Sequence, residues 1–281
     1  MGKFLVTGGA GSVGSSIVGR LIESGHDVVS ADLVAGRSLG VRHVEVDLTV
    51  RESLGDLVRD IDGLIHCAAI PDPVSRPRHV VFSNNVVGAY NLLEASLDAG
   101  VRNIVNLSSE CVYGFGYPRY PVSPNHLPLV ESGPLLASDA YGIGKIMVEQ
   151  LLDAYARELS DLSAWSLRAA WVLGPDEYSG FSTASGLETR RRSGVWAYID
   201  RDDLTTCAVA AIESRGSGHR VLNVASPENL VGEPLGELAA RKFGPGVEVD
   251  EPDSSRSGLD TSAAHRHLGF VAEHRWQDRV T

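Results

Sequence analysis

The segment SDAYGIGKIMVEQ, residues 138–150, holds a tyrosine and a lysine four positions apart. On a helix this spacing puts Tyr141 and Lys145 on one face, and an ammonium beside a phenol lowers the pKa of the phenol. A free tyrosine ionises at about pH 10, so it needs such help to exchange protons near neutral pH. The chain has 8 tyrosines, and its lysines are Lys3, Lys145 and Lys242. If these residues were placed at random, about 0.09 pairs with this spacing would be expected. The pair predicts acid–base chemistry, and a solvated helical pair is the alternative.

A glycine-rich stretch lies between the first apolar segment and the first helical pattern. Its glycines, of which the last three form G-x-G-x-x-G, are Gly8, Gly9, Gly11 and Gly14. Glycines permit a tight turn and close approach of a pyrophosphate, and a helix N-terminus offers N–H groups to the anion. Asp32 ends the next strand pattern, where a carboxylate binds ribose hydroxyls and repels a 2′-phosphate. The stretch predicts an NAD site rather than a ligand-free turn, with Arg37 as the nearby residue that weakens the selection against NADP.

Short β-rich segments alternate with helical patterns along the first two thirds of the chain. The expected strands are 3–7, 27–31, 42–46, 63–67, 102–108 and 163–170, and the expected helices include 85–97 and 148–159. Such alternation implies right-handed crossovers onto a parallel sheet. We therefore predict an α/β fold, a Rossmann doubly wound parallel sheet with a small C-terminal substrate lobe.

The pattern loosens after residue 174. A turn-rich segment precedes expected helices near 201–213, 233–242 and 260–268 and a strand near 220–226 that joins the main sheet. We expect an NAD-binding domain with the catalytic residues over 1–173 and a small, partly discontinuous substrate-binding lobe over 174–281. Ligands of open α/β sheets bind at the carboxyl edge, which the lobe would cover.

Composition excludes several classes of partner. A net charge of -11 gives no broad attraction to nucleic acid or to an anionic membrane. The one cationic cluster, 190–192, is expected to be a solvated loop, with contact of one arginine to an anionic substrate as the alternative. Cys67, Cys111 and Cys207 show neither metal-ligand spacing nor the even count of a disulfide framework, so no metal is expected. No apolar run is long enough to span a bilayer, and the start lacks a signal-peptide pattern. We expect a cytoplasmic protein.

Several motifs together give a family resemblance over almost the whole chain. They are TGGAGSVG (7–14), DL (47–48), HCAAI (66–70), NVVGAYNLLEA (85–95), SSECVYG (108–114), YGIGK (141–145), LRAAWVLGP (167–175), YIDRDDL (198–204) and LDTSAAHRHLGF (259–270). In this order they resemble the extended short-chain dehydrogenases/reductases, the NAD-dependent epimerase/dehydratase group.

The resemblance implies roles for individual residues. Ser109 would orient the substrate oxygen, Tyr141 would be the general acid/base, and Lys145 would lower its pKa while holding the nicotinamide ribose. The implied cofactor-binding residues, besides this tyrosine and lysine, are Gly8, Gly9, Gly11, Ser12, Val13, Gly14, Asp32, Asp47, Leu48, Ala68, Ala69 and Asn85. The implied substrate-binding residues are Ser109, Glu110, Cys111 and Trp171. From the residues alone, His66 and Ser108 are expected to be structural, and Asn85 to bind backbone.

Two departures from the family pattern bear on the substrate. Trp171 stands where sugar-nucleotide enzymes carry an asparagine that binds the phosphate-sugar portion, and the segment from Gly174 to Tyr198 looks short. These departures favour an NAD-dependent oxidoreductase acting on a secondary alcohol of a free sugar, sugar acid or polyol, similar to compact uronate dehydrogenases. The alternatives are a nucleotide-sugar 4-epimerase similar to UDP-glucose 4-epimerase, with tightly bound NAD, and a non-catalytic NAD-binding scaffold. The resemblance also implies a homodimer built through helices near 85–99 and 141–159.

Overall fold

The computed structural model describes residues 1–36, 40–181 and 183–279. By their internal contacts these residues form two compact units. The first unit comprises 1–108, 139–167 and 205–221, and the second comprises 109–138, 168–204 and 222–281 apart from the undescribed positions. In the part of the chain that is described, no helix is long and apolar enough to cross a membrane.

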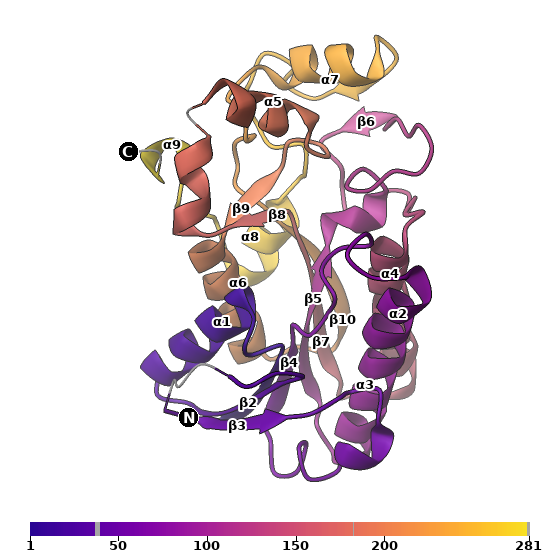
Figure 1. Cartoon of the computed structure of the whole chain (residues 1–281), viewed down its shortest axis with the longest axis vertical. Coiled ribbons are helices and arrows are strands. Elements are labelled where there is room, and N and C mark those ends of the chain that lie inside the picture. The colour runs from indigo at the N-terminus through magenta and orange to yellow at the C-terminus, as the bar shows by residue number, and fades with distance from the viewer. Residues whose placement is uncertain (37–39, 182, 280–281) are drawn as a thin grey trace. The chain divides into compact units, whose positions relative to one another are not determined.

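A seven-stranded sheet forms the centre of the fold (Figure 1). Its strands are β1 (Lys3–Thr7), β2 (Asp27–Asp32), β3 (Arg42–Glu45), β4 (Gly63–His66), β5 (Asn103–Ser109), β7 (Ser163–Ala169) and β10 (Gly218–Val224), in the order β10-β7-β5-β4-β1-β2-β3. The pairs β1–β2, β1–β4, β2–β3 and β4–β5 are parallel. The strand order reverses beside β1, which is the switch point of a doubly wound sheet. The predicted α/β Rossmann fold is confirmed.

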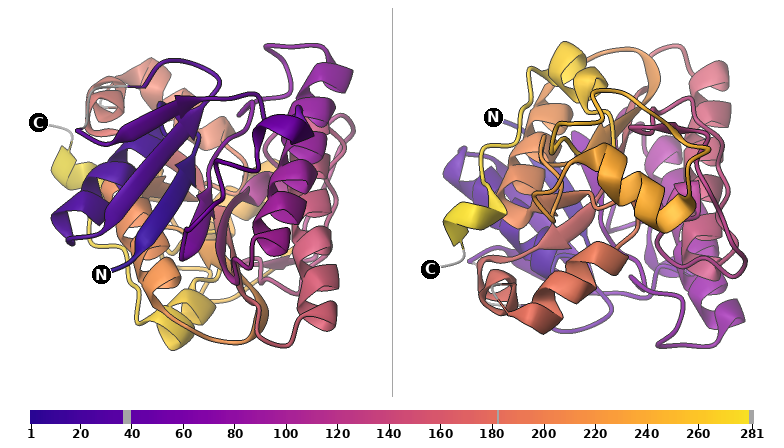
Figure 2. Two further views of the ribbon diagram at one scale, coloured as in Figure 1. Left: turned by 90° about the horizontal axis from the view of Figure 1, so that it is seen from below. Right: turned by 90° about the horizontal axis from the view of Figure 1, so that it is seen from above.

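Helices pack on both faces of this sheet (Figure 2). One face carries α1 (Ser12–Glu23) and α6 (Arg201–Glu213), joined by a hydrogen bond of 2.9 Å between Thr205 Oγ1 and Ser16 Oγ. The other face carries α2 (Arg78–Phe82), the π-helical turn η2 (Ser83–Val87), α3 (Gly88–Asp98) and α4 (Ala140–Glu158). Apolar side chains of α3, α4 and the strands form one core, which includes Leu5, Leu64, Leu92, Ile104, Val148 and Leu152.

The second unit holds two short parallel strand pairs and several helices. The pairs are β8 (Trp171–Leu173) with β9 (Tyr198–Asp200) and β6 (His126–Leu127) with β11 (Glu248–Val249). The α-helices that lie wholly in this unit are α5 (Ala184–Arg192), α7 (Leu235–Phe243), α8 (Ser262–Leu268) and α9 (Trp276–Arg279). The 3₁₀ turns are η3 (Glu110–Tyr113) and η4 (Pro175–Gly180), and η1 (Arg51–Ser53) lies in the first unit.

The division into units differs from a split at residue 173. Residues 109–138 and 168–173 group with the C-terminal segments because buried side chains join them there. The Tyr113 hydroxyl donates to Asn223 Oδ1 at 2.7 Å, and Arg168 donates to the Tyr113 oxygen at 2.9 Å. The strand expected near 220–226 forms as β10 and pairs with β7 at the edge of the main sheet.

The expectation of a solvated loop at 190–192 is wrong. These arginines end helix α5, and Arg190 is only 5% exposed. Its guanidinium donates to the carbonyls of Leu230 and Phe181 at 3.1 and 2.8 Å and lies 4.3 Å from the ring centroid of Trp276. Two carbonyls and an aromatic face therefore compensate the buried guanidinium, although its Nε makes no hydrogen bond to the described residues, and charge alone could not reveal this burial.

Candidate active site

The glycine loop between β1 and α1 has the shape expected of a phosphate cradle. Gly8 has a φ of +71°, and a Cβ on it would come 2.7 Å from the backbone nitrogen of Ala68. A Cβ on Gly14 would overlap the carbonyl of Gly8. Helix α1 starts after Gly11 with no side-chain cap, and Ser12 and Val13 form the accessible start of its first turn. The N–H groups and the dipole at this end of the helix suit an anion.

Asp32 at the end of β2 is fixed against this loop. Its Oδ2 accepts the backbone N–H of Ala10 at 3.0 Å, and its Oδ1 accepts the N–H of Leu33 at 2.7 Å. A carboxylate oxygen accepts more than one hydrogen bond, so both oxygens retain capacity for ribose hydroxyls. Arg37 lies outside the described residues.

The loops after β3 and β4 are held by hydrogen bonds from side chains of α3 and η2 and from the loop after β3 itself. Asn91 donates to the carbonyl of Leu48 at 3.2 Å, and Asp47 accepts the N–H of Thr49 at 2.8 Å. Asn85, 4% exposed, binds both backbone groups of Ile70, at 2.8 and 3.0 Å. These two hydrogen bonds fix the segment that contains Ala68 and Ala69. Asn85 itself lies in the π-helical turn, a distortion often found near functional sites.

The first turn of α4 presents Tyr141. Asp139 is the N-cap of the helix, and its Oδ1 accepts the N–H groups of Tyr141 and Gly142 at 2.9 and 2.8 Å. The carboxylate is 4% exposed, so the start of the helix is tightly defined. Sequence reasoning did not assign Asp139, although an aspartate just before a helical pattern is a known N-cap signal.

Tyr141 and Lys145 lie together on α4. The Lys145 Nζ is 5.6 Å from the centroid of the Tyr141 ring and donates to the carbonyl oxygen of Leu107 on β5 at 2.5 Å. Lys145 is 5% exposed, and Tyr141 keeps partial exposure. A buried ammonium next to a phenol stabilises the phenolate, so this geometry suits a tyrosine that exchanges protons.

His66 and Cys67 at the end of β4 face the same ammonium. The His66 Nδ1 and the Thr7 hydroxyl are 2.8 Å apart, and burial together with the charge of Lys145 lowers the pKa of His66 to about 3. Burial raises the pKa of the Cys67 thiol to about 12, against a smaller opposite effect of Lys145. Both groups are uncharged at neutral pH, and His66 has the bonding of a structural residue.

Ser108 and Ser109 at the end of β5 have different surroundings. The Ser108 hydroxyl donates to Oε1 of the buried Glu149 on α4 at 2.5 Å, a contact that sequence reasoning missed. Ser109, 7% exposed, is the first residue of the second unit, and its Oγ accepts the N–H of Cys111 at 3.2 Å as the N-cap of η3. Ser109 is therefore held by its own turn, while Tyr141 and Lys145 belong to the first unit.

Glu110 is the charged residue next to Ser109. Burial raises its pKa to about 8, an effect only partly offset by the Lys242 ammonium and by a hydrogen bond from the backbone N–H of Trp171. Lys242 donates to the carbonyls of Arg192, Ser193 and Gly194 at 3.2, 3.0 and 2.6 Å. The carboxyl group of Glu110 is therefore largely protonated at neutral pH. Cys111 beside it is buried.

Trp171 packs into an apolar cluster of the second unit. Its ring lies 5.9 Å from the ring of Phe181, and the cluster also contains Leu173, Tyr178, Tyr198 and Leu230. The side chain stays partly exposed. The indole therefore serves the core of this unit with one part of its surface and leaves the other part accessible.

Comparison with known proteins gives the chain its family. The model of the NAD dependent epimerase/dehydratase family matches residues 4–225. UDP-glucose 4-epimerases from Mycolicibacterium smegmatis and Streptomyces lividans are 32% and 28% identical, over 99% and 97% of this chain and 94% of each relative. The crystal structure of UDP-glucose 4-epimerase with UDP-glucose from Thermotoga maritima is 25% identical with a TM-score of 0.72, over 98% of this chain and 95% of that one. The chain belongs to the NAD-dependent epimerase/dehydratase family, whose members are extended short-chain dehydrogenases/reductases.

Proposed function

We propose that the protein is an NAD-dependent 4-epimerase of a nucleotide sugar. The observation that carries this proposal is the Tyr141–Lys145 pair on α4, with its ammonium anchored to β5, in a chain similar over nearly its full length to proteins named UDP-glucose 4-epimerase. The sequence alone favoured a dehydrogenase of a small sugar. The relatives favour the alternative, although the serine, tyrosine and lysine serve both reactions.

The first unit contains residues that fit NAD. The backbone around Gly8 and Gly14 is packed too closely for a side chain at either position, which keeps the turn before α1 tight, and Asp32 is oriented by the loop itself. Asp47, Leu48, Ala68 and Ala69 belong to loops that are fixed at the same carboxyl edge of the sheet, and Asn85 in η2 holds the second of these loops. NAD supplies a hydride acceptor that can return the hydride to the opposite face of the same carbon.

The protein's own residues would handle the proton. Tyr141, as phenolate, takes the proton of the substrate hydroxyl while the hydride leaves the same carbon, and returns it when the hydride comes back. Lys145 stabilises the phenolate by its charge. Ser109 supplies a hydroxyl to the substrate oxygen, and its Oγ is already oriented by the N–H of Cys111.

A dehydrogenase of a small sugar is the second candidate, and Trp171 favours it. Tryptophan has one donor and no acceptor, so it cannot replace the amide of an asparagine toward a phosphate-sugar group. In this structure the indole is partly engaged in the apolar cluster and partly accessible. An epimerase that carries Trp171 would hold the nucleotide portion of its substrate through other residues, with Glu110 and Cys111 among the proposed contacts.

One experiment distinguishes the two candidates. Purified protein is incubated with NAD and either UDP-glucose, UDP-galactose or a panel of free sugars and uronates, while NADH absorbance and the sugar products are followed. Interconversion of the two UDP-sugars without net NADH supports the epimerase. Stoichiometric NADH with a free sugar would refute it and establish the dehydrogenase. A protein that binds NAD but turns over neither class is the scaffold.

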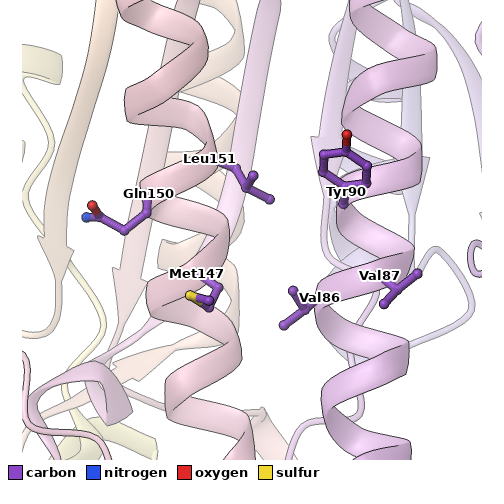
Figure 3. Close-up of a pocket in the computed structure, with 6 residues that line it drawn as sticks. All are labelled: Val86, Val87, Tyr90, Met147, Gln150 and Leu151. Atoms are coloured by element: carbon purple, nitrogen blue, oxygen red, sulfur yellow. The ribbon is translucent and has the colours of Figure 1, made fainter.

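We also propose a homodimer formed through α3 and α4. An apolar groove of about 350 Å³ is lined on one side by Val86 and Val87 of η2 and Tyr90 of α3, and on the other by Met147, Gln150 and Leu151 of α4 (Figure 3). Val87, Tyr90 and Met147 are 41%, 44% and 43% exposed. Large apolar side chains gathered on one surface favour association, and two helices per chain give a four-helix bundle with a second copy.

A further inference from the structure

A buried carboxylate lies one helical turn after Lys145. Glu149 is 1% exposed and Lys145 is 5% exposed, and both are on α4. Residues four apart on a helix are neighbours, so the two side chains share one face. A buried charge costs free energy unless an opposite charge or hydrogen bonds compensate it.

The other titratable groups shown to face Lys145 do not balance its charge throughout the proposed reaction. From β4 these groups are His66 and Cys67, which stay uncharged at neutral pH because burial lowers the pKa of the first to about 3 and raises that of the second to about 12. On α4 itself the neighbour is Tyr141, which in the proposed reaction is negative only as the phenolate and is neutral once it has taken the substrate proton. From β5 the carbonyl of Leu107 accepts a hydrogen bond from the ammonium.

Asp139 is the other buried carboxylate of this helix, and it has a different task. One of its oxygens accepts two backbone N–H groups at the start of α4. It therefore compensates the positive end of the helix dipole. Among the described buried residues of the first unit, Glu149 is the carboxylate placed to compensate Lys145.

Glu149 also holds the strand from which Ser109 follows. Its Oε1 accepts the hydroxyl of Ser108 at 2.5 Å, and Ser108 is the residue before Ser109 in the chain. The same face of α4 therefore fixes the end of β5 twice, through Lys145 at Leu107 and through Glu149 at Ser108.

We propose that Glu149 is a positioning residue that keeps Lys145 charged in its buried site and, through Ser108, fixes the end of β5. Its effect on catalysis rests on the proposed function. The charge compensation itself is a property of the folded protein and can be measured without substrate or cofactor.

The small number of lysines makes a direct test possible. The protein is labelled with ¹³C,¹⁵N-lysine, so that Lys3, Lys145 and Lys242 give three side-chain signals, which Lys3→Arg and Lys242→Arg assign. The pKa of Lys145 is then titrated in the wild type, in Glu149→Gln and in Ser108→Ala. Glu149→Gln should lower this pKa by about one unit or more, a tenfold loss of proton affinity, because it removes the nearby negative charge. Ser108→Ala keeps the carboxylate and is the matched control with a much smaller shift.

A change below about 0.3 units in a folded Glu149→Gln variant would overturn the proposal. If that variant does not fold, the melting temperatures of Lys145→Met and Lys145→Met/Glu149→Gln decide. Removing both charges leaves no uncompensated ion, so the double variant should melt several degrees higher than Lys145→Met alone. An equal or lower melting temperature would refute the pairing.

The catalytic consequence is a separate measurement. In Glu149→Gln, kcat/KM for UDP-sugar interconversion should fall at alkaline pH, where Lys145 loses its proton earlier than in the wild type. If the pKa shift is found while the wild-type protein turns over no nucleotide sugar, the proposed function fails and the charge pair stands. If turnover is found without the pKa shift, the proposed function stands and the charge pair fails.

Discussion

At the scale of single residues, the hydroxyl of Tyr141 is the group on which the proposed reaction depends. Phenylalanine in its place keeps the ring beside Lys145 and removes the proton carrier. Tyr141→Phe should therefore lower kcat by about 10²- to 10⁴-fold, the usual contribution of general acid–base catalysis, with little change in NAD affinity. Steady-state epimerisation assays and fluorescence titration with NAD measure the two effects. Unchanged turnover would contradict the assigned role.

Glu110 gives a prediction about pH and stability. Its pKa is raised from 4.5 to about 8 in the folded protein, so between these values the folded state keeps a proton that the unfolded state has released. The contribution of Glu110 to the free energy of unfolding then falls as the pH rises from 5 to 8. Glu110→Gln removes this loss. The free energy of unfolding of the variant, relative to that of the wild type, should therefore be about 1–2 kcal/mol higher at pH 8 than at pH 5, a value reduced for solvent screening because the side chain is partly exposed.

Urea unfolding of both proteins at the two pH values tests this expectation. The free energy of unfolding of the variant should rise relative to that of the wild type as the pH rises. A difference that stays constant between the two pH values would show that the pKa of Glu110 is not raised. The Lys242 ammonium faces Glu110 and opposes the shift, so Lys242→Met should raise the pKa of Glu110 further.

Some residues of the site could be read from the sequence and others could not. Tyr141, Lys145 and Gly8 were found because their spacing has a direct chemical meaning. Glu149 was missed although it continues the same four-residue spacing, because a glutamate at a helical position usually faces water. Its burial becomes apparent only when Ser108 on β5 is placed against it.

At the scale of elements, helix α1 offers a matched pair of glycines. A Cβ on Gly14 would overlap the carbonyl of Gly8, whereas a Cβ on Gly19 meets nothing within 4 Å. Gly14→Ala should therefore push the cradle apart and weaken NAD binding by about tenfold or more. Gly19→Ala should leave binding unchanged and stabilise the helix by about 0.5–1 kcal/mol. Calorimetric titration with NAD and thermal melts check both, and equal effects on binding would contradict the cradle.

The elements themselves were predicted unevenly, for physical reasons. β1, β4 and β5 form within a residue or two of their expected ranges because buried parallel strands are short apolar runs. The three-residue strands β8 and β9 carry too few positions for a periodic signal. α4 begins at Ala140, eight residues before the apolar pattern that predicted it, since its N-terminal half meets η2 at Gly144 and β5 through Lys145 rather than through a run of large apolar side chains.

At the scale of the whole molecule, the apolar groove between α3 and α4 predicts the state of association. Met147 is 43% exposed beside Tyr90, so Met147→Glu would put a carboxylate from each chain into the proposed interface. Burying these unpaired charges should weaken the dimer by about 100-fold or more. Sedimentation should then give twice the 30.0 kDa chain mass for the wild type and the single mass for Met147→Glu at micromolar concentration. Val271→Glu is the control, because Val271 is 55% exposed and lies outside both helices. A wild type that sediments as a monomer, or a Met147→Glu variant that stays dimeric, would exclude this face as the interface.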